Sequence, residues 1–482
     1  MPSIMIQHTS FRYALTLSFL VSSSLAFAQG NIHQQSTTYE WPTDSLVKNK
    51  LESWQDQKFG MIIHWGLYAV PGMIESWALC SEDWIERDSA SSYDKFKDWY
   101  WGLKKDFNPM KFDPDQWARA AHDAGMKYVV FTTKHHDGFN MFDTKQTDFK
   151  ITSGPFASNP KANVAKYVFE AFRKQNFMIG AYFSKPDWHS EYFWWPKYAT
   201  PDRNPNYDIR RHSWRWNKFK EFTYNQISEL MNEYGKIDIL WLDGGWVRPL
   251  ETVTDEVRAW GAPIPPWSQH VDMPRIATMA RKAQPGLLIV DRTVHGPYEN
   301  YQTPEQTIPK TKLDYPWESC ITLGGAWGYV PNDQFKSAAK VIHTLVEVVA
   351  KGGNLLLGVG PDARGLLSEI QISRLKDIGD WLSKNGEAIY GTRATEVFQS
   401  GNTFFTKGAG KQYAITCMPE GTPVPNTITW KGNVPRKGSI MKLISTNATL
   451  KWKVEGDVVK VFLPASATNS YSPALAFSYA VD

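Results

Sequence analysis

Short apolar runs alternate with amphipathic segments through most of this 482-residue chain. The runs have the length and β-branched content of buried strands, and the segments between them repeat apolar residues at helical spacing. The pattern predicts strands at 59–65, 128–132, 178–183, 237–242, 287–290 and 355–359, and helices at 115–124, 165–175, 214–234, 276–283, 335–351 and 368–384. Strands that alternate with helices predict a parallel sheet, and at least six such units favour a (β/α)8-like TIM barrel over an open doubly wound sheet.

The pattern changes near residue 393, where short alternating strands separated by Gly, Pro and Asn turns replace the strand-helix units. This change predicts a C-terminal antiparallel β-sandwich. We therefore expect a signal peptide at 1–28, an N-terminal linker at 29–45, a catalytic barrel at 46–393 and a β-sandwich domain at 394–482. Within the barrel, the pattern predicts a long irregular loop between the first strand and about residue 109.

The first 28 residues resemble an export signal. Arg12 precedes a short apolar stretch, which ends in the small-residue cleavage site Ala26-Phe27-Ala28. The stretch is shorter than the roughly 18 apolar residues that a membrane-spanning helix requires, so we expect cleavage near Ala28 and no membrane anchor. The chain is thus predicted to be exported, to the periplasm or out of the cell.

Three cysteines in an exported chain of this length form no C-x-x-C pair. We interpret Cys80, Cys320 and Cys417 as buried thiols, and a single Cys80–Cys320 bridge as the alternative. The formal net charge of +4 is small, and no long basic run occurs. We therefore expect no nucleic-acid partner, and the sequence does not indicate an oligomeric state.

Tryptophan is unusually abundant, with 22 residues. Most are expected to pack in the core, but flat aromatic rings also stack on the apolar faces of sugars. Four tryptophans near polar loops are the better candidates for sugar contacts: Trp99, Trp101, Trp194 and Trp195.

Polar side chains follow the predicted strands where each strand ends. The active site of a βα barrel lies at the carboxyl ends of its strands, so these side chains should meet at one face. They are His64 after the first strand, His135 and His136 after the second, Asp187 after the third, Asp243 after the fourth, and Asp291 and Arg292 after the fifth.

Asp243 ends the apolar run 237–242 and is followed by two glycines, so its carboxylate can face an open pocket. The alternative is a helix cap or a loop ion pair. If Asp243 acts in glycoside hydrolysis, a second carboxyl group is needed to protonate the leaving oxygen. The candidates are Glu299, Glu305 and Glu318, and their spacing does not choose among them.

The adjacent pair His135-His136 does not have the spacing of metal ligands. On a strand, neighbouring side chains point to opposite faces, and the chain contains no H-E-x-x-H motif. We therefore expect no metal and no other cofactor. The chain also lacks G-x-S-x-G and dinucleotide-binding motifs.

Several longer motifs resemble one enzyme family. They lie at 58–66, 128–138, 241–243, 317–329 and 385–390, and the second of them starts the sequence YVVFTTKHHDGF. No single motif is specific, but their order and spacing together are. Because of these motifs, residues 50–395 resemble glycoside hydrolase family 29, the retaining α-L-fucosidases.

The resemblance implies that Asp243 is the nucleophile, that Arg292 lies near it, and that four side chains line the fucose pocket: His64, His135, His136 and Trp241. It matches Tyr182 to a pocket tyrosine. The family has an adjacent Glu-Trp pair after the first strand, where this chain has Glu75-Ser76-Trp77. Glu75 and Trp77 are therefore substrate-binding candidates with one extra residue between them.

For the acid/base, the resemblance favours Glu305, with Glu299 second and Glu318 third. It implies an exo-acting, retaining α-L-fucosidase that hydrolyses terminal α-L-fucose from oligosaccharides or glycoconjugates by double displacement, without a cofactor. The alternatives are an α-L-galactosidase on the same scaffold and a non-catalytic fucose-binding protein.

Overall fold

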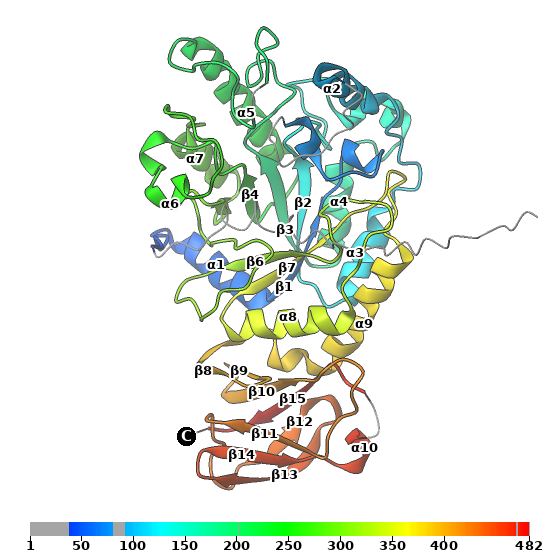
Figure 1. Cartoon of the computed structure of the whole chain (residues 1–482), viewed down its shortest axis with the longest axis vertical. Coiled ribbons are helices and arrows are strands. Elements are labelled where there is room, and N and C mark those ends of the chain that lie inside the picture. Colours follow the sequence, from blue (N-terminus) through cyan, green and yellow to red (C-terminus); the bar gives the residue numbers. More distant parts are fainter. Residues whose placement is uncertain (1–37, 81–91, 201, 469–470, 482) are drawn as a thin grey trace, which may run out of the picture.

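The computed structural model describes residues 38–80, 92–200, 202–468 and 471–481 (Figure 1). The expected signal peptide and its cleavage site lie outside the described residues. None of the described helices combines the length and the apolar character that crossing a bilayer would need. The described part of the expected linker packs on the barrel, because the Tyr39 hydroxyl donates to the Asn300 carbonyl at 2.7 Å and the Tyr39 ring stacks on Tyr315.

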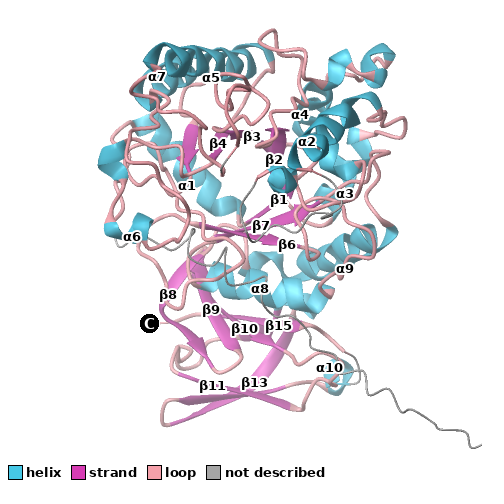
Figure 2. Ribbon diagram, turned by 45° about the horizontal axis from the view of Figure 1, so that its top comes forward, coloured by secondary structure: helices cyan, strands magenta, loops and turns pink. Residues whose placement is uncertain are grey.

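A parallel sheet of seven strands forms the core of the larger domain and confirms the predicted fold class. Its order is β5-β4-β3-β2-β1-β7-β6 (Figure 2). The strands are β1 (Phe59–Ile63), β2 (Tyr128–Lys134), β3 (Met178–Ser184), β4 (Ile239–Asp243), β5 (Leu288–Asp291), β6 (Glu318–Thr322) and β7 (Asn354–Val359). Six of them coincide with predicted strands, whereas β6 was not predicted because it begins with the polar pair Glu318-Ser319.

The segment 299–306 occupies the eighth position of the ring, between β5 and β6. The Asn300 amide donates to the Ile289 carbonyl at 2.9 Å, and the Cys320 amide donates to the Pro304 carbonyl at 3.1 Å. Isolated bridges join Val290 to Glu299 and Glu305 to Cys320. An irregular segment thus completes the barrel and carries Glu305 into its wall.

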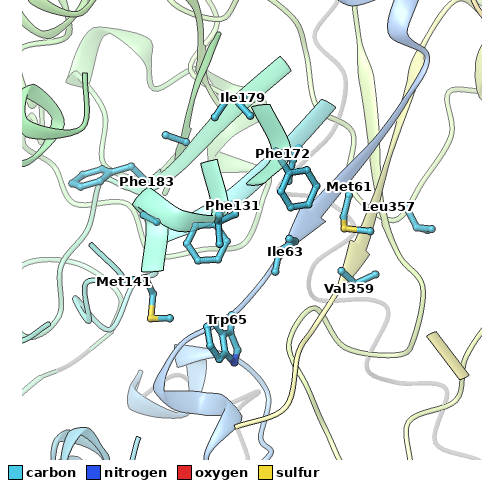
Figure 3. Packing of buried hydrophobic residues seen from close by; sticks show 14 of the residues in the cluster. Met61, Ile63, Trp65, Phe131, Met141, Phe172, Ile179, Phe183, Leu357 and Val359 are labelled. Atoms are coloured by element: carbon cyan, nitrogen blue, oxygen red, sulfur yellow. The ribbon is translucent and has the colours of Figure 1, made fainter. Parts of the chain in front are cut away.

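Helices cover the outer face of the sheet. The longer ones are α3 (Pro114–Asp123), α4 (Val164–Lys174), α5 (Ser213–Glu233), α7 (Met273–Ala283), α8 (Ala338–Ala350) and α9 (Glu369–Asn385). Phe172 of α4 belongs to the same buried cluster as Ile63, Phe131 and Phe183, which alternate with inward-facing residues along their strands (Figure 3). Full burial of each such side chain stabilises the fold by about 2–3 kcal/mol.

The inside of the barrel has its own apolar cluster, and a helix that the sequence analysis did not predict closes one end. This helix is α1 (Ser45–Gln57), whose Trp54 is fully buried and stacks on Tyr301 with ring centroids 3.9 Å apart. Ile239 and Trp241 of β4 belong to the inner cluster. Because strand side chains alternate, Asp243 lies on the same inward face, at the opposite end.

The loop after β1 was predicted to be irregular, but part of it is helical. It contains α2 (Tyr93–Gly102), which the Ser92 hydroxyl caps by accepting from the Lys95 amide. Two shorter helices, α6 (Asp255–Arg258) and α10 (Ala465–Thr468), lie elsewhere in the chain.

The C-terminal domain is a curled antiparallel sheet of eight strands in the order β11-β14-β13-β12-β15-β10-β9-β8. The strands are β8 (Arg393–Ser400), β9 (Thr403–Gly408), β10 (Lys411–Cys417), β11 (Thr427–Lys431), β12 (Met441–Leu443), β13 (Ala448–Glu455), β14 (Val458–Phe462) and β15 (Ala474–Tyr479). The sheet folds over a core that includes Phe405, Trp430 and Phe477.

The outer face of this sheet packs on α8 and α9, which lie between the two domains (Figures 1 and 2). Trp381 donates its indole N–H to the Ala474 carbonyl at 2.9 Å, and the His343 ring bonds to the Pro473 carbonyl at 2.7 Å. These contacts brace the barrel through the two helices that flank β7.

All three cysteines are buried thiols outside any disulfide of the described residues, as the buried-thiol interpretation predicted. The alternative Cys80–Cys320 bridge is wrong. Cys320 lies inside the barrel, where its sulfur is 3.7 Å from a nitrogen of Arg292.

Candidate active site

Asp243 ends β4 at the open end of the barrel, and its side chain remains 14% exposed. Its Oδ2 accepts the Tyr182 hydroxyl at 2.7 Å. Its Oδ1 accepts the Gly244 amide at 2.8 Å and Nη1 of Arg292 at 3.1 Å. These donors fix the orientation of the carboxylate at the pocket.

Arg292 follows β5 and joins two carboxylates. Its Nη2 donates to Oε2 of Glu305 at 2.7 Å, while Nη1 binds Asp243. The guanidinium lies over the Trp241 ring at 4.5 Å, and Nε donates to the Thr303 hydroxyl at 3.0 Å. Burial works to lower the pKa of Arg292, but the neighbouring charges, chiefly that of Asp243, raise it above its usual value. Arg292 is therefore a permanent cation between the two acids.

Of the three candidate acids, Glu305 binds the same guanidinium as Asp243. Its Oε1 also accepts the indole N–H of Trp327 at 3.1 Å, and its side chain is 9% exposed. Glu299 is engaged in its own loop, where it accepts the Thr293 amide at 2.8 Å and pairs with His295 at 2.6 Å. The geometry thus favours Glu305 over Glu299.

Glu318 lies deeper, inside the barrel. It accepts the Tyr128 hydroxyl at 2.6 Å and the Trp241 indole N–H at 3.2 Å, and it is completely buried. Burial raises the pKa of Glu318 to about 7. Glu318 therefore holds the Trp241 ring, over which the Arg292 guanidinium lies.

Three histidines gather around Asp243. The His136 ring places Nε2 3.7 Å from Asp243, and its Nδ1 bonds to the Ser184 hydroxyl at 2.7 Å. The His135 Nδ1 bonds to the Ser76 hydroxyl. Burial lowers the pKa of His64 to about 3, that of His135 to about 4, and that of His136 well below its usual value. Neutral imidazoles can both donate and accept hydrogen bonds, which suits sugar hydroxyls.

The expectation that His135 and His136 point to opposite faces is wrong. Strand β2 ends at Lys134, so both residues follow the strand, and their ring centroids are 4.2 Å apart. Ligand atoms of His135, His136 and Asp243 lie within 4.8 Å of one another, a group that could hold a metal ion. The Arg292 cation on the same carboxylate opposes a second cation there.

The loop after β1 supplies another wall. Oε1 of Glu75 accepts the backbone amides of Trp327 at 2.8 Å and Gly328 at 2.9 Å, and burial raises the pKa of Glu75 to about 7. Trp77 packs edge-on against His136 with ring centroids 5.1 Å apart. The extra residue between them, Ser76, holds His135 in place.

Trp327 is a site residue that the sequence analysis missed. Its ring lies 4.9 Å from that of His64, and its indole N–H binds Glu305. A Cβ at Gly358 would lie 2.7 Å from this ring, and one at Gly360 would lie 2.4 Å from the Gly328 backbone. The Gly-x-Gly sequence at the end of β7 was the signal that a loop packs closely there.

Trp246 and Arg203 were also missed. The Trp246 ring lies 5.1 Å from that of His136, and the Arg203 guanidinium lies over Trp77 and Trp246. Trp246 directly follows the Asp243-Gly244-Gly245 turn, so its position in the chain was the available signal.

Two other strand-end carboxylates are part of buried ion pairs. Asp187 lies 3.2 Å from Lys134, and Asp291 lies 2.5 Å from Lys185. Asp291 faces outward because it alternates with the inward-facing Val290. These acids support the strand ends rather than the pocket.

The sequence and the fold were compared with known proteins. The family model described as Alpha-L-fucosidase matches residues 26–387. Mouse tissue alpha-L-fucosidase is 30% identical over 408 residues, which cover 80% of this chain and 81% of that protein. Human tissue alpha-L-fucosidase is 28% identical over 439 residues, covering 87% and 86%.

Solved structures agree. Alpha-L-fucosidase isoenzyme 1 from Paenibacillus thiaminolyticus superposes with a TM-score of 0.72 and 28% identity, over 91% of this chain and 100% of that chain. The Thermotoga maritima alpha-fucosidase in complex with a mechanism-based inhibitor gives 0.71 and 26%, over 92% and 100%.

Proposed function

The chain belongs to the α-L-fucosidase family of glycoside hydrolases, and we propose that it removes terminal α-L-fucose from oligosaccharides or glycoconjugates with retention of configuration. The observation that carries this proposal is the pair of carboxylates, Asp243 and Glu305, on one guanidinium at the mouth of the barrel. Fucose-binding without catalysis would not require two acids in this arrangement.

In the first step, a carboxylate oxygen of Asp243 attacks the anomeric carbon of the fucoside. Glu305 gives its proton to the glycosidic oxygen as the bond to the leaving group breaks. The products are the free leaving group and a β-fucosyl ester on Asp243.

In the second step, Glu305 acts as a base and takes a proton from water. The water oxygen attacks the anomeric carbon, and the bond to Asp243 breaks. α-L-Fucose leaves, and both carboxyl groups return to their starting states. Retaining enzymes hold the two groups about 5–5.5 Å apart, and a shared guanidinium is compatible with so short a separation.

The three neutral histidines are suited to bind the hydroxyls of fucose, and Trp77 and Trp246 offer an apolar surface for its C6 methyl group. A hydrophobic pocket rejects an added hydroxyl by only about 10²-fold. We therefore expect slow hydrolysis of α-L-galactosides. A preference for the galactoside over the fucoside would contradict the proposed substrate.

Replacement of each carboxylate tests the roles. The Asp243→Gly variant should lose turnover of an aryl α-L-fucoside, and added azide should restore it with formation of β-L-fucosyl azide. The Glu305→Ala variant should still form the ester from activated aryl fucosides, whose leaving groups need no acid, but hydrolysis of the ester should be slow without the base. Azide needs no base, so it should speed turnover and give α-L-fucosyl azide. The opposite anomers, or full activity of Asp243→Gly, would contradict the assignment.

Glu299→Gln is the matched control, since Glu299 lies in the same segment but holds Thr293 and His295. It should retain turnover and give no azide adduct.

We also propose that the chain is exported after cleavage near Ala28, which N-terminal sequencing of the secreted protein would test.

A further inference from the structure

Three aromatic side chains form an exposed cluster, here called the rim cluster: Trp195, Tyr198 and Trp214. Trp214 is 54% exposed and Tyr198 is 41% exposed, whereas Trp195 is half-buried. The Trp195 ring lies 5.3 Å from that of Tyr198 and 6.5 Å from that of Trp214. Contiguous exposed aromatic surface in a water-soluble domain commonly marks a binding site.

The rim cluster lies on the same end of the barrel as the candidate active site. Trp195 and Tyr198 lie between β3 and α5, in the part of the chain that begins where β3 ends. Trp214 is in the first turn of α5, and the first turns of barrel helices lie beside the carboxyl ends of the strands.

Two stacked aromatic rings link the segment that carries the rim cluster to His136. Trp188 packs on His136 with ring centroids 5.3 Å apart and stacks on Trp194 at 5.1 Å, with ring planes 3° apart. Trp194 is the direct neighbour of Trp195 in the chain. Trp188 and Trp194 are themselves buried, so they anchor the segment that carries the rim cluster beside His136.

The rim cluster is held in place by polar contacts. The Asn206 side chain donates to the carbonyls of Trp195 and Tyr198, both at 2.9 Å, and accepts the Trp195 amide at 2.7 Å. The buried Arg215 guanidinium lies 4.0 Å from the Trp195 ring centroid and 5.0 Å from that of Trp214. A preorganised aromatic surface loses little entropy when a ligand binds.

We propose that the rim cluster is a platform for the leaving group, which binds the sugar residues to which fucose is attached. This inference rests on the proposed function. The C–H faces of pyranose rings are apolar and flat, so they stack on exposed indole and phenol rings. The preferred substrates are then oligosaccharides extended beyond the fucosylated sugar, rather than short fucosides.

The test compares two substrates in three variants. Trp214→Ala and Tyr198→Ala should lower kcat/KM for a fucosylated pentasaccharide by about five- to tenfold, mainly by raising KM. With 4-nitrophenyl α-L-fucoside, which has no extended leaving group, kcat/KM should stay within about twofold of wild type. Inhibition by free L-fucose should not change.

Trp41→Ala is the matched control, since Trp41 is also 54% exposed but lies in the segment that leads into α1, at the closed end of the barrel. The platform is contradicted by three outcomes: no loss on the pentasaccharide, an equal loss on both substrates, or the same loss in the control. A change of oligomeric state in Trp214→Ala would assign the cluster to a contact between copies instead. If wild-type protein fails to hydrolyse the aryl fucoside, the proposed function fails independently of the rim cluster.

Discussion

Asp243 and Glu305 bind two nitrogens of the same guanidinium group, that of Arg292, at 3.1 and 2.7 Å. A guanidinium is planar and rigid, so it sets the relative position of two acids more firmly than an ammonium could. It also carries one positive charge between two groups that can both be negative. The geometry of the pair therefore depends on Arg292 as much as on β4, which carries Asp243, and on the irregular segment that carries Glu305.

Replacement of Arg292 by Lys tests this dependence. The lysine keeps the charge but has one nitrogen on a flexible stem, so it cannot hold the two carboxylates in the geometry that the planar guanidinium sets, and we expect kcat for an aryl fucoside to fall by about 10²-fold. Arg364→Lys is the control, because Arg364 pairs with Asp362 with its side chain 65% exposed. If Arg292→Lys keeps near-wild-type turnover, a shared guanidinium is not needed to position the acids.

Glu318 should make the fold less stable as pH rises. Burial raises the pKa of Glu318 from 4.5 to about 7, so its protonated form is favoured in the folded state. Its contribution to stability is complete below pH 4.5 and is lost as pH rises through 7. The glutamine in Glu318→Gln stays neutral, so this variant does not lose stability in the same way. The free energy of unfolding of the variant minus that of wild type should therefore rise by up to about 3 kcal/mol between pH 4.5 and 8.

Urea unfolding of both proteins at pH 5 and pH 8 measures this change, and the comparison cancels the titration of other buried groups. Glu52→Gln, at an exposed position of α1, should show no such pH dependence. A constant difference between Glu318→Gln and wild type across this range would mean that Glu318 is not protonated in the fold.

Gly138 should not tolerate a side chain. Its φ is +79°, and a Cβ there would lie 2.1 Å from Oδ1 of Asp187, the partner of Lys134. Gly138→Ala should therefore destabilise the protein by about 3–5 kcal/mol, because it displaces one member of a buried ion pair. Gly401→Ala, at φ +58° in open space, should cost only about 1–2 kcal/mol of backbone strain.

Thermal unfolding of the two alanine variants separates the clash from the strain. Equal shifts of Tm would show that the clash at Asp187 is relieved without cost.

Removal of metal ions should leave activity unchanged. His135, His136 and Asp243 could hold an ion, but Asp243 already accepts from Arg292 and Tyr182. We expect dialysis against EDTA to preserve kcat for the aryl fucoside. Loss of activity that Zn²⁺ restores and Mg²⁺ does not would instead identify a catalytic metal at the histidine pair.

The strands that the sequence predicted are those whose apolar pattern is local and continuous. The runs at 178–183 and 355–359 differ from β3 and β7 by one residue at one end. The strand β6 escaped prediction because Glu318 is a buried acid, whose hydrogen bonds to Tyr128 and Trp241 come from distant strands. No local pattern records such partners.

The same distinction applies to the candidate site. The position of Asp243 after an apolar run already placed a carboxylate at a strand end, and its alternation with Trp241 sets the inward direction. The choice among Glu299, Glu305 and Glu318 depended on which one meets Arg292, and this is a contact between a loop and a strand end. Trp327 joins the pocket through its contact with His64, 263 positions earlier in the chain.

The sequence by itself determined the strand-helix alternation, the polar residues at the strand ends and the family resemblance, because these are written in the spacing of neighbouring residues. The tertiary structure decided that an irregular segment fills the eighth position of the barrel, that two adjacent histidines lie side by side and that Glu305 and Asp243 share the Arg292 guanidinium. These depend on packing between residues far apart in the chain, and loop geometry of this kind follows from the whole set of contacts rather than from local propensity.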